Sequence, residues 1–221
     1  MAYGFRVTNA SGVMQIDGSY RNFSFRSKGS RTCTGDAGGA TGLKLASVTV
    51  TGAVAPMIAI DPGADTVGIW RTSVSGTTWT FYFLGASGAT FDYWVFDYYT
   101  ADPGVTYGLI VRNVSNQVVF HSGAAPLQVK AVGGVGTTSG LPSGRNYAAI
   151  QTTPGFYDYY QPELEFMGQF PYRSWTYGVH MPSSTAVSLS VMPFEFYMVG
   201  GEGPTTTSPA PQIFIVDVTH L

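Results

Sequence analysis

The acidic residues are the first candidates for chemistry, because paired carboxylates can transfer protons or bind a cation. Glu163 and Glu165 lie at positions i and i+2 of a predicted strand, on one face, with Asp158 nearby. Paired carboxylates can cleave glycosidic bonds, but two glutamates on one strand face are far more often simply exposed. Asp61 and Asp65 flank a Pro-Gly-Ala turn and resemble half of a calcium loop, without the spacing of a full ligand set. We therefore predict no catalytic residues here.

Histidine and cysteine give no stronger case for a metal or a nucleophile. No histidine has a partner at H-x-x-x-H or H-E-x-x-H spacing; the three are His121, His180 and His220. Cys33 is the single cysteine, which excludes an internal disulfide and a cysteine-based zinc cluster, and no neighbouring feature favours a reactive thiol. No G-x-S-x-G elbow or phosphate-binding glycine loop occurs. The sequence therefore predicts no enzyme, no metal site and no cofactor.

Aromatic residues are the best candidates for a binding surface, and they make up 14% of the chain. Tyrosine and tryptophan rings offer stacking area together with a polar group, and they are enriched in the cores of protein interfaces. Subunit contacts and an ordinary β core are both favoured over binding of a receptor sugar. The candidate interface residues are Trp94, Phe96, Tyr157, Tyr159, Tyr160, Trp175 and Tyr177.

The elements that position these side chains are strands, and one hairpin organises the rest. Tyr107 to Phe120 reads YGLIVRNVSNQVVF, with the period-2 alternation of a strand on both sides of a turn. Asn113 can bond its own backbone two residues on, and Asn116 tolerates a positive φ. This combination predicts a type I turn followed by a left-handed residue, as in three-residue hairpins.

The same hairpin opens the chain, as YGFRVTNASGVMQI from Tyr3 to Ile16. The offset is 107 − 3 = 104 residues, and it holds through the turn. Asn9 corresponds to Asn113, and Gly12 corresponds to Asn116; glycine and asparagine are the residues that best adopt the left-handed conformation. We therefore predict one structural unit used twice.

Short runs of alternating residues punctuated by turns continue along the chain, and no segment of helical length shows a 3.6-residue period. This pattern predicts an all-β fold with an antiparallel, β-sandwich-like architecture. Strands such as Phe91–Tyr98 are apolar on both faces, which indicates burial on both sides. The duplicated hairpin predicts two β domains, residues 1–104 and 105–221.

Composition bears on partners. Charged residues are 11% and hydrophobic residues 44% of the chain, against about 25% charged residues in typical domains. A chain with so few charged residues is expected to bury apolar surface in a homo-oligomer or a tight complex. The net charge of −2 gives no sign of nucleic-acid binding. The basic stretch Arg21–Arg31 is expected to be a solvated strand face, and no apolar run approaches the ~20 residues of a membrane helix, so no membrane insertion is expected.

The segments MAYGFRVTNASG, FDYWVFDYY, YGLIVRNVSNQVVFHSG and GRNYAAI together resemble small all-β structural proteins encoded in the tail genes of tailed bacteriophages. The resemblance covers roughly Met1 to Ile150, and His121 stands where that family commonly has an acidic residue. The last third of the chain is not placed by it. The resemblance implies a virion component of the tail tip or baseplate and brings no catalytic residues.

We therefore expect a structural phage tail protein, made in the host cytoplasm without a signal peptide, that assembles with itself or with other tail proteins in the virion. The alternative is a receptor-binding module that recognises a host surface glycan or protein. A glycan-cleaving tail enzyme comes third.

Overall fold

The computed structural model describes strands and turns, with no helix among the described residues. The predicted all-β, antiparallel, sandwich-like class is therefore confirmed. The described residues are 6–8, 14–17, 21–37, 42–98, 108–153, 155–160, 170–199, 206–207 and 209–221.

The first large sheet has six strands in the order β12-β19-β14-β6-β9-β3, all paired in antiparallel fashion. Sequence neighbours are rarely sheet neighbours here, so the sheet is built from long-range pairings. Its strands are β3 (Phe23–Thr32), β6 (Met57–Asp61), β9 (Thr90–Tyr98), β12 (Val129–Gly133), β14 (Tyr147–Thr153) and β19 (Gln212–Asp217).

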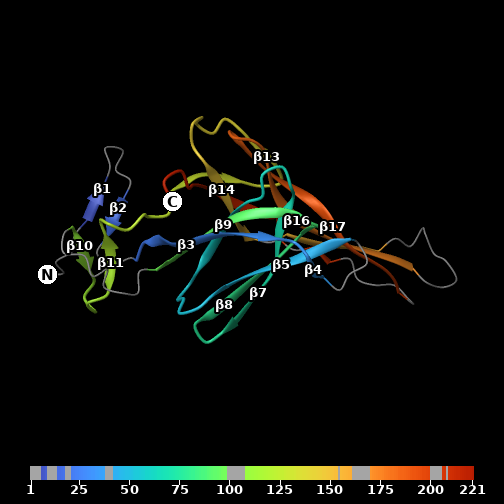
Figure 1. The fold of residues 1–221 in the computed structure, drawn as a ribbon, viewed down its shortest axis with the longest axis horizontal. Helices are drawn as coiled ribbons and strands as arrows, with labels where there is room; N and C mark the ends of the chain where they lie inside the picture. Colours follow the sequence, from blue (N-terminus) through green and yellow to red (C-terminus); the bar gives the residue numbers. More distant parts are fainter. Residues whose placement is uncertain are drawn as a thin grey trace.

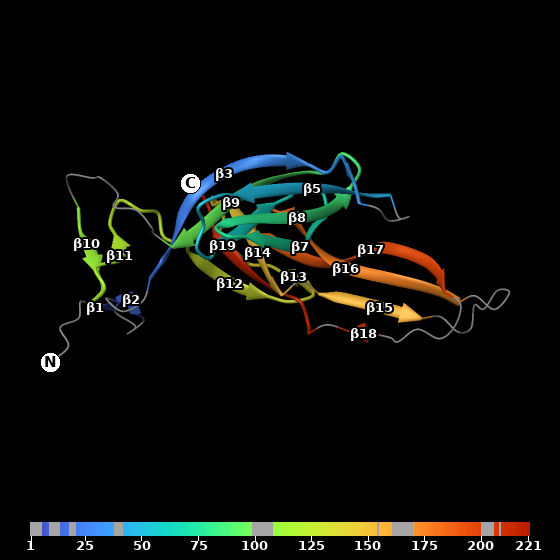
Figure 2. The same ribbon diagram turned by 90° about the horizontal axis from the view of Figure 1, so that it is seen from below.

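The second large sheet has nine strands, seven of them in the order β13-β17-β16-β7-β8-β5-β4. Strand β15 pairs with β16, and β18 pairs with β15 to complete the sheet. The long hairpin β16–β17 and its neighbour β15 extend beyond the sandwich as an arm (Figures 1 and 2). The strands are β4 (Gly35–Asp36), β5 (Leu43–Val50), β7 (Val67–Ser75), β8 (Thr78–Ala86), β13 (Gly136–Thr138), β15 (Phe156–Tyr160), β16 (Phe170–Ser183), β17 (Ala186–Val199) and β18 (Thr206–Thr207).

Alternation along the strands builds the main core between the two sheets. Phe91 and Val95 of β9 enter this core and meet Phe83 of β8 from the other sheet. The next positions of β9, Trp94 and Phe96, belong to a second apolar cluster on the opposite face of the six-stranded sheet. The expectation that this strand is buried on both faces is therefore confirmed.

The second cluster is buried because the six-stranded sheet closes on itself at one end. The N–H of Phe25 donates to Ala125 O at 2.8 Å, and the N–H of Leu127 donates to Phe23 O at 2.9 Å. On its other side, the same segment pairs with β19, because the N–H of Asp217 donates to the carbonyl oxygen of residue 128 at 3.0 Å. Residues 125–128 thus join β3 to β19. The buried members of the cluster are Ala59, Trp94, Phe96, Ala148, Ile150, Val216 and Val218.

The strand orders show that the duplication extends through the whole fold. In the six-stranded sheet, the strands of the second repeat run β12-β19-β14 from one edge, and those of the first run β3-β9-β6 from the other edge. Counted from its own edge, each repeat therefore contributes its strands in the same order. In the nine-stranded sheet, the second repeat runs β13-β17-β16 from one edge, and the first repeat runs β4-β5-β8-β7 from the other edge. The two orders match when β5 is treated as an insertion. The strands β3, β4, β6, β7, β8 and β9 therefore correspond in order to β12, β13, β14, β16, β17 and β19.

This arrangement corrects the predicted domain division. Residues 1–104 and 105–221 do form two repeats of one topology, but strands from both repeats share each large sheet. They pair directly where Ile60 meets Ala149 and where Val67 meets Val179. The chain is therefore one sandwich made of two repeats, and its sheets do not divide at residue 104.

Each repeat begins with a small hairpin outside the sandwich, and the two hairpins lie together at the end opposite to the arm (Figure 1). Their registers coincide at the offset of the sequence repeat, because Val7 pairs with Ile16 and Val111 pairs with Phe120. The register shifts at the next residue in both. The predicted duplication of the hairpin is confirmed by this pairing. The strands are β1 (Arg6–Thr8), β2 (Met14–Asp17), β10 (Ile110–Arg112) and β11 (Val118–His121).

The turn of the second hairpin has the predicted chemistry. Asn116 has φ of 61°. The Oδ1 of Asn113 accepts the N–H of Ser115 at 3.0 Å and the N–H of Gln117 at 2.9 Å. Both asparagines therefore do what the sequence indicated, one as an acceptor for the turn backbone and one as its left-handed residue. The corresponding residues Asn9 and Gly12 of the first hairpin lie outside the described residues.

The repeats meet at a seam between β7 and β16. These strands pair at Val67 and Val179 and then separate. The side chain of Gln151, from β14 in the other sheet, bridges the separation: its Oε1 accepts the N–H of Ile69, and its Nε2 donates to Tyr177 O, both at 3.1 Å. A side-chain amide thus replaces a missing rung of the backbone ladder at the centre of the molecule.

Candidate functional site

The aromatic residues proposed from the sequence are divided by the fold into two groups. Trp94 and Phe96 lie in the second cluster, with exposed fractions of 9% and 0%. They belong to the core of this chain, so the proposal that they contact another subunit is not supported by their burial. Sequence alternation could show that both faces of β9 are covered, but it could not show that the chain itself provides the cover.

The remaining aromatic candidates come together on the arm. In the pairing of β15 with β16, Tyr157 lies opposite Trp175, Tyr159 opposite position 173, and Tyr160 opposite position 172. Trp175 and Tyr177 are both half-buried, and Tyr177 packs against the main core. The structure therefore brings five of the seven proposed residues onto two neighbouring strands, with Tyr177 at the base of the arm.

The carboxylates do not assemble into a catalytic or metal centre. Asp61 lies opposite Asp92 across β6 and β9. Burial raises the pKa of Asp61, and the charge of Asp92 raises it further, while the N–H of Gly63 donates to Asp61 at 2.9 Å and lowers it. Asp65 instead accepts the N–H of Thr90 at 3.0 Å. Among the described residues, no group of three or more His, Cys, Asp and Glu could hold a metal ion.

Two clefts flank the loop that carries Asp61. One has a volume of 280 Å³ and is lined on its other side by Arg145 and Ser183. The other has a volume of 240 Å³ and is lined by Ser30 and Asp92. Of the carboxylates at their walls, Asp61 accepts the backbone N–H of Gly63, and the glutamates at positions 163 and 165 lie outside the described residues. We see no constellation here that favours glycan cleavage.

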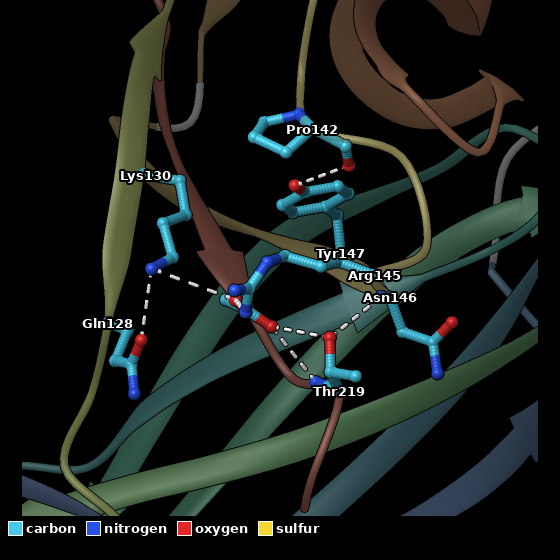
Figure 3. A network of polar contacts seen from close by, with 8 residues as sticks. Gln128, Lys130, Pro142, Arg145, Asn146, Tyr147 and Thr219 are labelled. Carbon is cyan, nitrogen blue, oxygen red and sulfur yellow. Dashed lines mark hydrogen bonds and ion pairs between the residues drawn. The ribbon is translucent and has the colours of Figure 1, made fainter.

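Asp217 is the centre of a polar network that the sequence analysis missed (Figure 3). Its carboxylate accepts from Arg145 Nη1 and from Thr219 Oγ1, each at 2.6 Å, and Lys130 Nζ lies 3.7 Å away. Burial raises the pKa of Asp217, but the hydrogen bonds from Thr219 and Arg145 outweigh it and hold the pKa below its usual value. The network joins β12, the segment before β14, and the end of β19, so its role is structural.

Asp97 has the same role in the first repeat. Its carboxylate accepts the N–H groups of Val54, Ala55 and Tyr98 at 2.8–3.0 Å and pairs with Arg26 Nη1 at 2.9 Å. The carboxylate thus holds the segment before β6 against β3 and β9. A signal was present for both residues: Asp97 and Asp217 each follow a run of apolar residues near the end of a strand, where a buried charge requires partners.

The basic stretch is an exposed face, as expected, but its side chains are engaged. Lys28 Nζ donates to Leu221 O at 2.7 Å, and Arg31 Nε donates to Ser47 O at 3.1 Å. Cys33 is fully buried. Burial and the charge of Asp65 raise its thiol pKa to about 11, so it is not poised as a nucleophile.

The outer side of β12 is the candidate surface for assembly. Val129 and Val132 of β12, and Val135 between β12 and β13, have exposed fractions of 45%, 62% and 59%, and we call these three residues the valine edge. Strand β12 pairs with β19 on one side, and no described strand pairs with its other side. Val132 lies opposite Phe214, a half-buried member of the second cluster. Apolar surface therefore reaches solvent beside an open strand edge.

The matching edge of the first repeat is protected. Strand β3 carries Arg26, Lys28 and Arg31, and residues 125–127 pair with its first part. Charged residues on an edge strand are a common means of preventing unwanted strand pairing. The second repeat has only Lys130 on β12, and that side chain turns towards Asp217. The two equivalent edges therefore differ in their capacity to accept a partner.

Comparison of the chain with protein-family models, with curated proteins and with solved structures gave no match. Within the part of the chain that is described, no helix is long and apolar enough to cross a membrane. The geometry set out above is therefore what supports a function for this chain.

Proposed function

We propose that the chain is a structural component of a bacteriophage tail, at the tail tip or baseplate, that assembles with copies of itself or with other tail proteins. The observation that carries the proposal is the valine edge, an open strand edge with exposed apolar side chains in a chain that has 11% charged residues. The sequence resemblance to phage tail proteins supplies the biological setting.

The physical argument for assembly rests on the cost of leaving this edge exposed. An open strand edge with apolar side chains is a template for pairing with another chain. The first repeat blocks its equivalent edge with cations and with residues 125–127, whereas the second repeat leaves the valines uncovered. A fold that protects one of two equivalent edges and exposes the other is suited to a directed contact through the exposed one.

The decisive experiment measures assembly and folding separately. In Val132→Lys, a charge replaces the most exposed valine of the edge, and Val114→Lys makes the same replacement at the tip of the second hairpin, where the side chain is 103% exposed. We expect the wild type and Val114→Lys to sediment as the same assembly, and Val132→Lys to dissociate. At a concentration low enough to dissociate the wild type, all three should melt at nearly the same temperature, since surface substitutions cost within about 0.5 kcal/mol.

The setting is tested on particles. Mass spectrometry of purified tails from the phage that encodes this chain should detect it in stoichiometric amount. Absence of the chain from purified tails refutes the tail assignment, whatever the sedimentation result. An unaltered assembly of Val132→Lys refutes the valine edge as the contact, and a wild type that stays monomeric at high concentration and finds no tail partner refutes the assembly role.

The second candidate function is a module that binds a host surface glycan or protein. The observation that favours it is the exposed Arg71, whose guanidinium lies over the rings of Trp70 and Tyr82. A panel of glycans separates the two functions, because a purely structural subunit binds none of them specifically.

A further inference from the structure

A cation held by two aromatic rings lies on the outer face of the nine-stranded sheet. Arg71 of β7 lies opposite Tyr82 of β8, and the register is irregular between Ile69 and Arg71, at the position of Trp70. The guanidinium carbon of Arg71 is 4.8 Å from the centroid of the Trp70 ring and 4.4 Å from that of Tyr82. Both distances are within the range of a cation–π contact, so the rings hold the position of an otherwise flexible side chain.

Contacts with ring faces leave the hydrogen-bonding edges of the guanidinium unused. Arginine has five N–H donors in a planar fork. In the described part of the chain, Arg26, Arg31 and Arg145 each donate to an oxygen of the protein, whereas Arg71 makes contacts with the two rings alone. Its side chain is exposed. The donors of Arg71 are therefore directed to solvent and free to bind an external anion.

Within the described residues, the strands on the Tyr82 side of Arg71 supply no counter-ion. The strands β5, β7 and β8 contain no aspartate or glutamate, and they carry Lys44 in addition to Arg71. Arg26 and Arg145 each pair with an aspartate, whereas Arg71 has no carboxylate partner among the described residues.

Hydroxyl groups border the stack on the same face. Ser47 lies opposite Tyr82, and Thr80 lies opposite both Thr49 and Ser73. Residues two apart on a strand share a face, so these side chains adjoin the stack. Thr49 Oγ1 and Thr80 Oγ1 are 3.2 Å apart and hydrogen-bonded. The face therefore combines one cation, two rings and a row of small hydroxyls.

We propose that Trp70, Arg71 and Tyr82 form a binding site for an acidic saccharide. The planar fork of the guanidinium matches a carboxylate or a phosphate oxygen pair and binds it in bidentate fashion. The rings hold the guanidinium in position, and the neighbouring hydroxyls hydrogen-bond to those of the sugar. A nucleic acid is a poorer fit, because a single arginine on a chain of net charge −2 forms no basic stripe.

The proposal goes beyond the assembly role and does not depend on it, so binding is measured on the wild type and on Val132→Lys alike. The probes are oligosaccharides that carry a carboxylate, a matched set that carry a phosphate, and neutral counterparts, titrated into the purified chain up to millimolar concentration. We expect at least one acidic set to bind saturably, and the neutral counterparts to bind at least tenfold more weakly.

Three variants identify the site. Arg71→Met should lower the affinity at least tenfold, and Arg71→Lys should lower it by a smaller factor, because it keeps the charge and loses the fork. Arg112→Met removes an exposed arginine of β10 and should bind as the wild type does. The two Arg71 variants should melt like the wild type, because that side chain is exposed, and Arg112→Met loses one hydrogen bond to Asn116 O in the hairpin turn.

Two results would overturn the proposal. One is the failure of every acidic oligosaccharide to bind the wild type saturably. The other is equal affinity of Arg71→Met and the wild type, which would place any binding elsewhere on the chain. Dissociation of Val132→Lys with its saccharide binding intact would support both proposals. If Val132→Lys stays assembled, only the assembly proposal is refuted. If the wild type assembles but binds no acidic saccharide, only the saccharide site is refuted.

Discussion

Gly68→Ala is the substitution that most directly tests the seam between the two repeats. A Cβ added at Gly68 would overlap the carbonyl oxygen of Tyr177, lie 3.0 Å from the carbonyl carbon of that residue and lie 3.1 Å from the Cα of Gly178. These are backbone atoms of β16, so no rotation of a side chain can relieve the overlap. The strands β7 and β16 must move apart, and they belong to different repeats.

The expected cost follows from that displacement. Overpacking of a well-packed site costs typically about 1–3 kcal/mol. Separation of the strands also strains the two hydrogen bonds of Gln151 to Ile69 and Tyr177, each worth about 1 kcal/mol. We therefore expect Gly68→Ala to lower the free energy of unfolding by about 3 kcal/mol or more. For a chain of this size, that corresponds to a fall of roughly 6–12 °C in melting temperature.

The control is Gly134→Ala, at the corner between β12 and β13. A Cβ there meets Pro211 O at 3.8 Å, an ordinary van der Waals contact. Gly134→Ala should therefore melt within a few degrees of the wild type. Hydrogen exchange adds a local measurement, since the amide of Ile69 should exchange faster in Gly68→Ala. Equal melting temperatures for the two variants, or an unchanged Ile69 amide, would show that the repeats are not held at this seam.

Three further substitutions test the turn, the Asp217 network and the second cluster. Asn116→Val should raise the hydrogen-exchange rate of the Asn113 amide, because φ of 61° costs a β-branched residue about 1–2 kcal/mol or more. Asn116→Gly should leave this rate nearly unchanged. Equal damage by both substitutions would contradict the turn assignment. The pKa of Asp217 is lowered in the folded chain, so its contribution is present above the unfolded pKa of about 4 and lost as pH falls through the folded value. Asp217→Asn should lower the free energy of unfolding by about 1–3 kcal/mol at neutral pH. The fall of that free energy at acidic pH, measured by denaturant titration, should also be less steep in this variant. An unchanged pH dependence would show that the carboxylate is not linked to folding. Trp94→Ala should lower the free energy of unfolding by about 3–5 kcal/mol, and dissociation without a lower melting temperature would show that Trp94 is an interface residue instead.

Local chemistry carried the predictions that the structure confirms. The turn at Asn113 and Asn116 depends on side-chain acceptors and a positive φ within five residues, so the sequence contains all of its determinants. The all-β class follows from period-2 alternation and frequent turns. The repeat was visible because the hairpin chemistry survives at both positions, with Val7 and Val111 at equivalent places in the register.

Long-range pairing was beyond the sequence. The duplicated hairpin predicted two β domains, whereas Ile60 of the first repeat pairs with Ala149 of the second. The burial of Trp94 depends in the same way on residues 125–128, which close the sheet from more than 25 positions further along the chain. An alternation pattern reports that a face is covered, and it does not report which part of which chain covers it.

The candidate surfaces occur where the two repeats differ, and this is the strongest structural argument for their relevance. Shared strands build the sandwich and its seam, which any pair of such repeats requires. Strand β5 is present only in the first repeat, and it extends the sheet face that carries Arg71. Strand β15 is present only in the second, and it builds the aromatic arm. The edges also differ, cationic on β3 and apolar on β12. Because stability constrains both repeats alike, divergence confined to one of them is where a function other than folding is expected.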